Sequence, residues 1–184
     1  MAQDEHLNFS AHPQTPESPS YTQELVLLAL AWVYTLYRLY WSSPFPWSHN
    51  IHLPIHEAGH LLFTPFGEFM HFLGGSLFQV AFPLAFVVSF IFRREVFSAI
   101  LVLIWCGDSL IDVSYYIGDA YAQQMPLIGG EHDWAYLLGE LDKVHYATQL
   151  GTFTWWWGAL LMLGACVGAT FVLNQKAGFI RVKA

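Results

Sequence analysis

The residues best suited to chemistry are the five at 56–60, with the sequence HEAGH. On a helix, residues four apart share one face, so His56 and His60 can offer two imidazoles to one metal ion. Glu57 lies on the neighbouring flank, where a carboxylate can take a proton from a water molecule that the metal activates. In a chain of this composition the pattern arises by chance about 0.02 times. The spacing therefore predicts a zinc-binding site with a general base beside it.

Two histidines leave such a site one protein ligand short. A histidine at position 66, which a metzincin would supply, is replaced by Phe66. We expect the third ligand from another segment, with Asp112 as first choice and Asp108 and His132 behind it. Asp108 and Asp112 are four residues apart on one face of an apolar stretch. Their alternative role is that of protonated or hydrogen-bonded packing groups.

His132 belongs to a loop with the sequence GGEHDW, which also contains Glu131 and Asp133. The alternative for that loop is an ordinary polar turn after two glycines. His52 precedes His56 by one turn, and His49 lies close to the same face. Those two histidines predict either a second metal site or interfacial side chains.

Composition indicates the environment of these residues. Of 184 residues, 55% are hydrophobic and only 11% are charged, against about 25% charged in a typical soluble domain. The net charge of −7 argues against a nucleic-acid partner. Both cysteines lie in apolar runs, which argues against a disulfide scaffold. We therefore predict an integral membrane protein whose partner is the lipid bilayer.

A bilayer core about 30 Å thick needs roughly 20 apolar residues in a helix. Four runs meet or approach that length: 25–41, 69–92, 96–118 and 150–173. The run 51–66 is shorter and more polar, with Pro54 and Pro65, and either crosses or re-enters. Inside lipid its histidines and glutamate must be paired or functional. The segment is therefore expected to face the bundle interior or a wet cavity, where a purely structural hydrogen-bonded cluster is the alternative to a metal site.

Positive charge favours the crossing interpretation. Lys and Arg collect on the cytoplasmic side of membrane proteins. If 51–66 crosses, six of the seven basic residues share one side: Arg38, Arg93, Arg94, Lys176, Arg181 and Lys183. We therefore predict an all-α bundle of about five transmembrane helices, with the N-terminus outside and the C-terminus inside.

Depth gives a further expectation. At 1.5 Å per residue, Asp112 should lie roughly 25 Å from the inner face, and His56 and His60 about 7–14 Å from it if their helix begins there. A tilted helix, or one that starts deeper after the turn at Pro44–Pro46, would close this gap. Residues 1–22 are predicted to form a flexible acidic Pro/Ser tail, and 23–184 a single membrane domain with an outer loop at 119–149.

HEAGH on a membrane helix, with an aspartate on a later one, resembles the site-2-protease group of intramembrane zinc metalloproteases. The stretch 56–119 also resembles a set of small bacterial membrane proteins near that group. The resemblance implies zinc ligands at His56 and His60, a general base at Glu57, and a multi-pass protein of a bacterial inner membrane. That group takes its third ligand from an LDG-type motif; CGDSLIDV at 106–113 only approximates it.

The function predicted is therefore a membrane-embedded zinc hydrolase, a protease that cleaves membrane or juxtamembrane peptides. One alternative is a non-catalytic metal- or haem-binding subunit, with His56 or His60 paired with His71 as axial ligands. Another is a metal-ion or proton transporter that uses the His and Asp rows as a relay.

Overall fold

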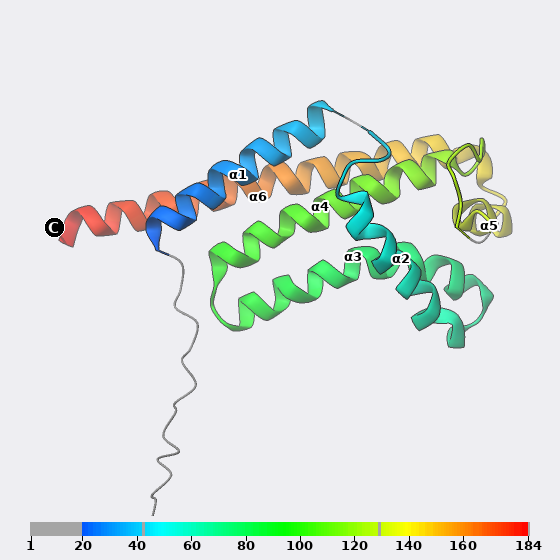
Figure 1. Cartoon of the computed structure of the whole chain (residues 1–184), viewed down its shortest axis with the longest axis horizontal. Helices are drawn as coiled ribbons and strands as arrows, with labels where there is room; N and C mark the ends of the chain where they lie inside the picture. Colours follow the sequence, from blue (N-terminus) through cyan, green and yellow to red (C-terminus); the bar gives the residue numbers. More distant parts are fainter. Residues whose placement is uncertain (1–19, 42, 129, 184) are drawn as a thin grey trace, which may run out of the picture.

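The computed structural model describes residues 20–41, 43–128 and 130–183, with side chains described to Gly178. These residues form helices and no strands, which confirms the all-α prediction (Figure 1). The α-helices are α1 (Tyr21–Tyr40), α2 (His49–Phe63), α3 (Glu68–Phe92), α4 (Val96–Asp119), α5 (Asp133–Glu140) and α6 (Ala147–Lys183), with 3-10 turns η1 (Thr64–Phe66) and η2 (Val144–Tyr146).

Three stretches among the described residues are long and apolar enough to cross a membrane: Glu68–Phe92, Val96–Asp119 and Val144–Gly178. They correspond to α3, α4 and η2 with α6. Leucines, phenylalanines and tryptophans remain exposed along them, as expected where the outer surface meets lipid rather than water. The predicted membrane character is thus supported by three helices.

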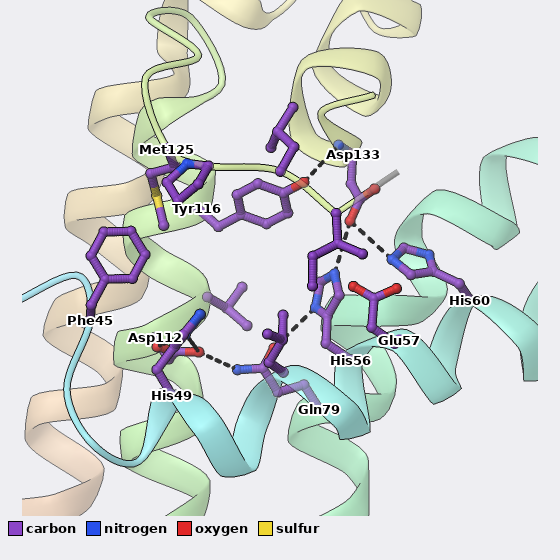
Figure 2. Close-up of a pocket in the computed structure, with 15 residues that line it drawn as sticks. Phe45, His49, His56, Glu57, His60, Gln79, Asp112, Tyr116, Met125 and Asp133 are labelled. Carbon is purple, nitrogen blue, oxygen red and sulfur yellow. Dashed lines mark hydrogen bonds and ion pairs between the residues drawn. The ribbon is translucent and has the colours of Figure 1, made fainter. Parts of the chain in front are cut away.

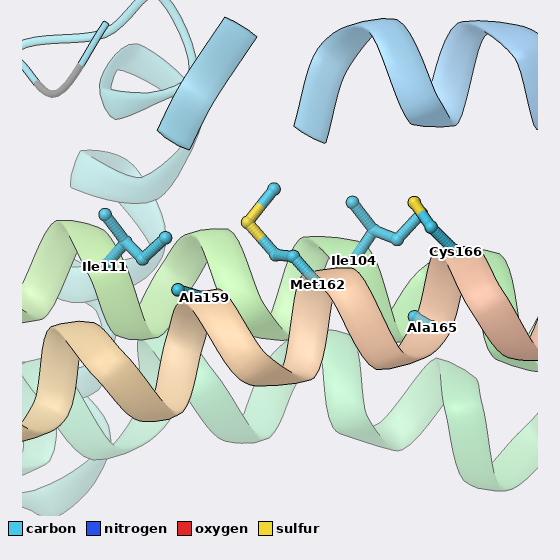
Figure 3. Close-up of a cluster of buried hydrophobic side chains, with 6 residues drawn as sticks. All are labelled: Ile104, Ile111, Ala159, Met162, Ala165 and Cys166. Carbon is cyan, nitrogen blue, oxygen red and sulfur yellow. The ribbon is translucent and has the colours of Figure 1, made fainter. Parts of the chain in front are cut away.

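The helices α4 and α6 form the centre of the bundle. Their shared core contains large apolar side chains opposite small ones, namely Ile104, Ile111, Ala159, Met162, Ala165 and Cys166 (Figure 3). Small side chains let two helix backbones approach closely, so dispersion contacts can hold them together in an apolar solvent. This pair is the scaffold from which α4 presents Asp108 and Asp112.

The first two helices are steeply inclined to each other, and both run toward the end of the bundle that holds α5 (Figure 1). Near the start of α1, Glu24 binds Lys176 of α6 at 2.6 Å, and near its end Arg38 binds Asp108 of α4 at 2.7 Å. Helix α2 then begins with His49 beside Asp112, 3.0 Å away. Its 15 residues cover about 22 Å, less than a bilayer core. Helix α2 therefore starts about two-thirds of the way along α4, which agrees with the expectation that the helix could start deeper after the turn at Pro44–Pro46.

This course brings the start of α1 and the end of α6 to the same end of the bundle (Figure 1). The sequence expectation had the two chain ends on opposite sides. That expectation counted residues 51–66 as a return crossing, whereas α2 starts beside Asp112 and runs from there toward the end of the bundle that holds α5 (Figure 1). Hydropathy does not predict how deep in the bundle α2 starts, because that depth depends on the contacts that Arg38 and His49 make with α4 on either side of the connecting turn.

The expected outer loop, 119–149, is partly helical. Helix α5 and turn η2 fold over the end of α4, where Ala120, Leu138 and Ala147 are buried together. Residues 1–19, the main part of the predicted tail, lie outside the described residues. Helix α1 already begins at Tyr21 with a capping box between Ser20 and Gln23, because a serine side chain satisfies the first unpaired backbone N–H groups.

Candidate metal centre

Close packing of α2 on α3 positions the histidine pair. A Cβ atom on Gly59 would lie 2.3 Å from the carbonyl oxygen of Gly74, so neither helix could carry a larger residue there without moving apart. One residue along, a Cβ on Gly75 would lie 2.5 Å from His56 Nε2 and 2.7 Å from His60 Nε2. The two imidazoles therefore occupy the space that a side chain at position 75 would fill.

Three metal-binding groups converge at this point. His56 Nε2 lies 2.9 Å and His60 Nε2 3.3 Å from Oδ2 of Asp133, the first residue of α5 (Figure 2). One ligand atom from each of the three residues lies within 4.8 Å of the other two. His56 and Asp133 are buried, and His60 is partly buried. This group could hold a metal ion.

Hydrogen bonds fix which nitrogen of each ring faces inward. His56 Nδ1 lies 3.0 Å from Gln79 Oε1, and His60 Nδ1 lies 2.8 Å from the backbone carbonyl oxygen of His71. Both partners are acceptors, so each Nδ1 donates to its partner. Each Nε2 then faces Asp133, to which it donates while it carries a proton and beside which it offers a lone pair to a metal ion once that proton is lost. Metal-ligating histidines commonly donate the other N–H to an oxygen in this way.

The orientation of Gln79 is itself fixed. Its amide nitrogen donates to Oδ2 of Asp112 at 2.9 Å, which leaves Oε1 facing His56. Asp112 therefore reaches the histidine pair through Gln79 and not directly. Asp112, which we expected to be the third ligand, supports His56 through Gln79. The carboxylate that lies beside the two histidines is that of Asp133.

Electrostatics favour a positive charge between the three groups. Two lone pairs and a carboxylate repel one another unless a proton or a cation lies among them. Burial raises the pKa of the Asp133 carboxyl, but its contacts with His56 and His60 outweigh burial and lower that pKa below its ordinary value. The carboxylate therefore stays ionised and available as a ligand.

The backbone around Asp133 is anchored to two helices. Its N–H donates to the hydroxyl oxygen of Tyr116 on α4 at 3.1 Å. The next residue, Trp134, donates from Nε1 to Oγ of Ser76 on α3 at 3.0 Å. These bonds hold the start of α5 over the face of α2 that carries the histidines.

His132 supports this loop and does not join the pair. Its Nδ1 accepts the N–H of Ala135 at 3.3 Å as the N-cap of α5, and its Nε2 lies 3.4 Å from Oδ2 of Asp119. Its ring stacks on Tyr116 with centroids 4.2 Å apart. Asp119 in turn accepts the N–H groups of Gln124 and Met125. His132 thus helps to hold in place the segment that brings Asp133 to His56 and His60.

Asp108 also lies outside the histidine pair. It accepts hydrogen bonds from Arg38 Nε and from the Tyr34 hydroxyl. Arg38 is fully buried, so Asp108 has the cationic partner that a carboxylate at this depth needs. His52 lies between the two aspartates of α4, 3.7 Å from Asp108 and 3.4 Å from Asp112.

The general-base candidate shares a cavity with the metal-binding group. Glu57 is partly buried and lines a cavity of about 290 Å³ together with His56, His60 and Asp133. Figure 2 shows its carboxylate beside the two imidazoles. The predicted residues His56, Glu57 and His60 are thus brought together, in a space that can admit a small part of a substrate.

Asp133 is the member of this group that sequence reasoning did not rank as a ligand. The signal for it was the GGEHDW loop, where three consecutive ligand-type side chains precede an amphipathic stretch. Which of the three points inward depends on the phase of α5, and the cap formed by His132 sets that phase.

Comparison of the chain with protein-family models, with curated proteins and with solved structures found no match.

Proposed function

We propose that this protein is a membrane-embedded zinc hydrolase that cleaves peptide bonds in membrane or juxtamembrane segments. The observation that carries the proposal is the convergence of His56, His60 and Asp133 on one point with Glu57 in the same cavity. Two imidazoles, one carboxylate and a position left open to the cavity are the donor set of catalytic zinc sites.

The distances suit zinc. Zinc–nitrogen and zinc–oxygen bonds of 2.0–2.2 Å in a tetrahedron separate the ligand atoms by about 3.3 Å. His60 Nε2 is 3.3 Å and His56 Nε2 2.9 Å from Asp133 Oδ2. Mixed nitrogen and oxygen donors also suit zinc better than magnesium or calcium, which prefer oxygen alone.

Each residue then has a role. A bound zinc ion would supply the Lewis acidity that makes water a nucleophile near neutral pH. Glu57 accepts the proton of the attacking water and returns it to the leaving amine. Gln79 and Asp112 hold the His56 ring, and Tyr116 holds the backbone of Asp133.

Charge supports an orientation. Arg93 and Arg94 lie between α3 and α4, at the same end of the bundle as Lys176 near the end of α6. We propose that this end faces the cytoplasm of a bacterial cell, with both chain ends on that side. The metal centre then lies in the outer half of the membrane. The start of α1 beside Lys176 supports an inside N-terminus instead of the outside one expected from the sequence.

The alternatives fit less well. The rings of His60 and His71 pack directly against each other, with centroids 5.0 Å apart and Nδ1 of His60 bonded to the His71 carbonyl, which leaves no space for a porphyrin between them. A transporter needs a polar path through the bundle. Between Asp108 and the pair Glu24–Lys176, the core among the described residues contains Leu28, Phe97 and Leu173 and no buried acidic or basic side chain.

The test is Glu57→Gln in the full chain, purified in detergent with zinc and assayed on a quenched-fluorescent peptide library. We expect hydrolysis to fall by about 10²–10⁴-fold, since general-base catalysis contributes that much, while zinc content stays at the wild-type level. Glu68→Gln, at the start of α3 and outside the cavity, is the matched control and should retain activity. Full hydrolysis by a zinc-loaded Glu57→Gln variant would refute the mechanism.

A further inference from the structure

A second cavity adjoins the cavity that contains Glu57. It has a volume of about 630 Å³ and lies between α4, α6 and the segment after α4. Phe45 and Met125 line both this cavity and the one that contains Glu57. Figure 2 shows these two side chains together at the end of the first cavity that is farthest from His60. The two cavities are therefore neighbours separated by two side chains.

The second cavity lies at the end of the bundle opposite Arg93, Arg94 and Lys176. Gly118 and Asp119 line it from the last turn of α4, and Thr148 and Thr152 from the first turns of α6. Trp155 is also part of its wall, and tryptophan is enriched where a membrane meets water. A molecule in this cavity lies at the level of the membrane surface.

Both cavities combine polar and apolar side chains. In the first, apolar side chains from three segments, among them Leu53, Val113 and Ile128, line the wall beside the ionisable groups of the candidate metal centre. The second has hydroxyl and amide groups from Gln124, Thr148 and Thr152 beside the rings of Phe45 and Trp155. Its one carboxylate, Asp119, already accepts two backbone N–H groups. Each cavity thus offers apolar contacts and hydrogen-bonding groups side by side.

We propose that the two cavities form one substrate cleft, occupied by an extended juxtamembrane polypeptide segment, with Phe45 and Met125 separating two subsites. This inference rests on the proposed function. An extended peptide carries amide groups that suit the polar groups of both cavities and side chains that suit their apolar walls. A lipid acyl chain has no groups for the polar lining, because hydrocarbon gains nothing from hydroxyls and amides.

Hydroxamates, which chelate zinc, test the zinc site and the two-subsite cleft separately. The probes are acetohydroxamic acid, a peptidyl hydroxamate long enough to pass Phe45, and an alkyl hydroxamate of the same length, each titrated against the zinc-loaded full chain in detergent. We expect the peptide to bind at least about tenfold more tightly than acetohydroxamic acid, because it adds contacts in the second cavity. The alkyl probe should not share that gain.

Tryptophan substitutions test whether the tighter binding of the peptidyl hydroxamate comes from the second cavity. Thr148→Trp and Thr152→Trp each fill the second cavity from an exposed position on α6, so either should abolish the gain of the peptide and leave acetohydroxamic acid binding unchanged. Gln149→Trp is the control, since Gln149 is exposed and does not line the cavity.

Failure of acetohydroxamic acid to bind would contradict the proposed zinc hydrolase itself. Normal binding of that small probe without a gain for the peptide, or with a gain that both tryptophan variants retain, would overturn the two-subsite cleft alone. An equal gain for the alkyl probe would overturn the assignment of a polypeptide.

Discussion

Helix α2 carries two histidine pairs that face aspartates in different ways. His56 and His60 turn their Nε2 atoms toward a single oxygen of Asp133, while their Nδ1 atoms are bound to Gln79 and to a backbone carbonyl. His49 and His52 both approach Asp112, and His52 has no hydrogen-bond partner on either nitrogen. Both pairs are rich in nitrogen and carboxylate, yet only the first converges.

The difference shows what spacing does and does not provide. A metal site needs lone pairs that meet at one point and outer groups that hold the rings. The second pair lacks the outer acceptors, and its neighbour Asp108 is already neutralised by Arg38. That region is an ionic junction that joins α1 and α2 to α4, and the first pair is the candidate metal centre.

Removing each histidine pair of α2 in turn tests the difference between them most directly. His56→Ala/His60→Ala should lower zinc affinity by more than about 100-fold, because loss of ligands exceeds the loss seen when supporting groups are removed. His49→Ala/His52→Ala should retain zinc within a few-fold. Metal analysis of the two purified variants beside the wild type checks this. Equal zinc loss in both would mean that the two regions form one site.

A second comparison concerns the aspartates. Asp133→Asn removes a charged ligand, whereas Asp112→Asn removes a support that acts through Gln79. We expect Asp133→Asn to weaken zinc binding by about 100-fold and Asp112→Asn by about 10-fold, the lower end of the range for supporting groups. Zinc titration with a competing chelator measures both. The reverse order would restore Asp112 as the third ligand.

The smallest effect is expected from a single methyl group. Gly75→Ala would bring a Cβ to 2.5 Å from His56 Nε2 and force the imidazoles apart, which should reduce zinc affinity and cost about 1–3 kcal/mol of stability. Gly164→Ala on α6 meets nothing within 4 Å, so both quantities should stay unchanged. Unfolding temperatures measured with and without zinc distinguish the two variants. Equal temperatures for both variants would contradict the requirement for glycine at position 75.

Much of the fold could be predicted from local pattern. The runs 69–92, 96–118 and 150–173 correspond closely to α3, α4 and α6, because hydropathy over about 20 residues reports the requirement of a bilayer. The run 25–41 also lies in a helix, α1, but α1 is not among the three described helices that are long and apolar enough to cross a membrane. The helix at 51–66 was expected, but its starting depth depends on contacts of His49 and Arg38 with α4.

The sequence by itself determined a helical membrane protein with two imidazoles on one face of a helix and a carboxylate on the neighbouring flank, since hydrophobicity and the 3.6-residue period are local properties of the chain. Only the tertiary structure decided which acid meets them. Asp133 is 73 residues beyond His60 in the sequence, counted as 133 minus 60, and it reaches the histidines because Tyr116, Ser76 and the cap at His132 fix the start of α5. Contacts between segments so far apart depend on how whole helices pack, and no local pattern encodes that packing.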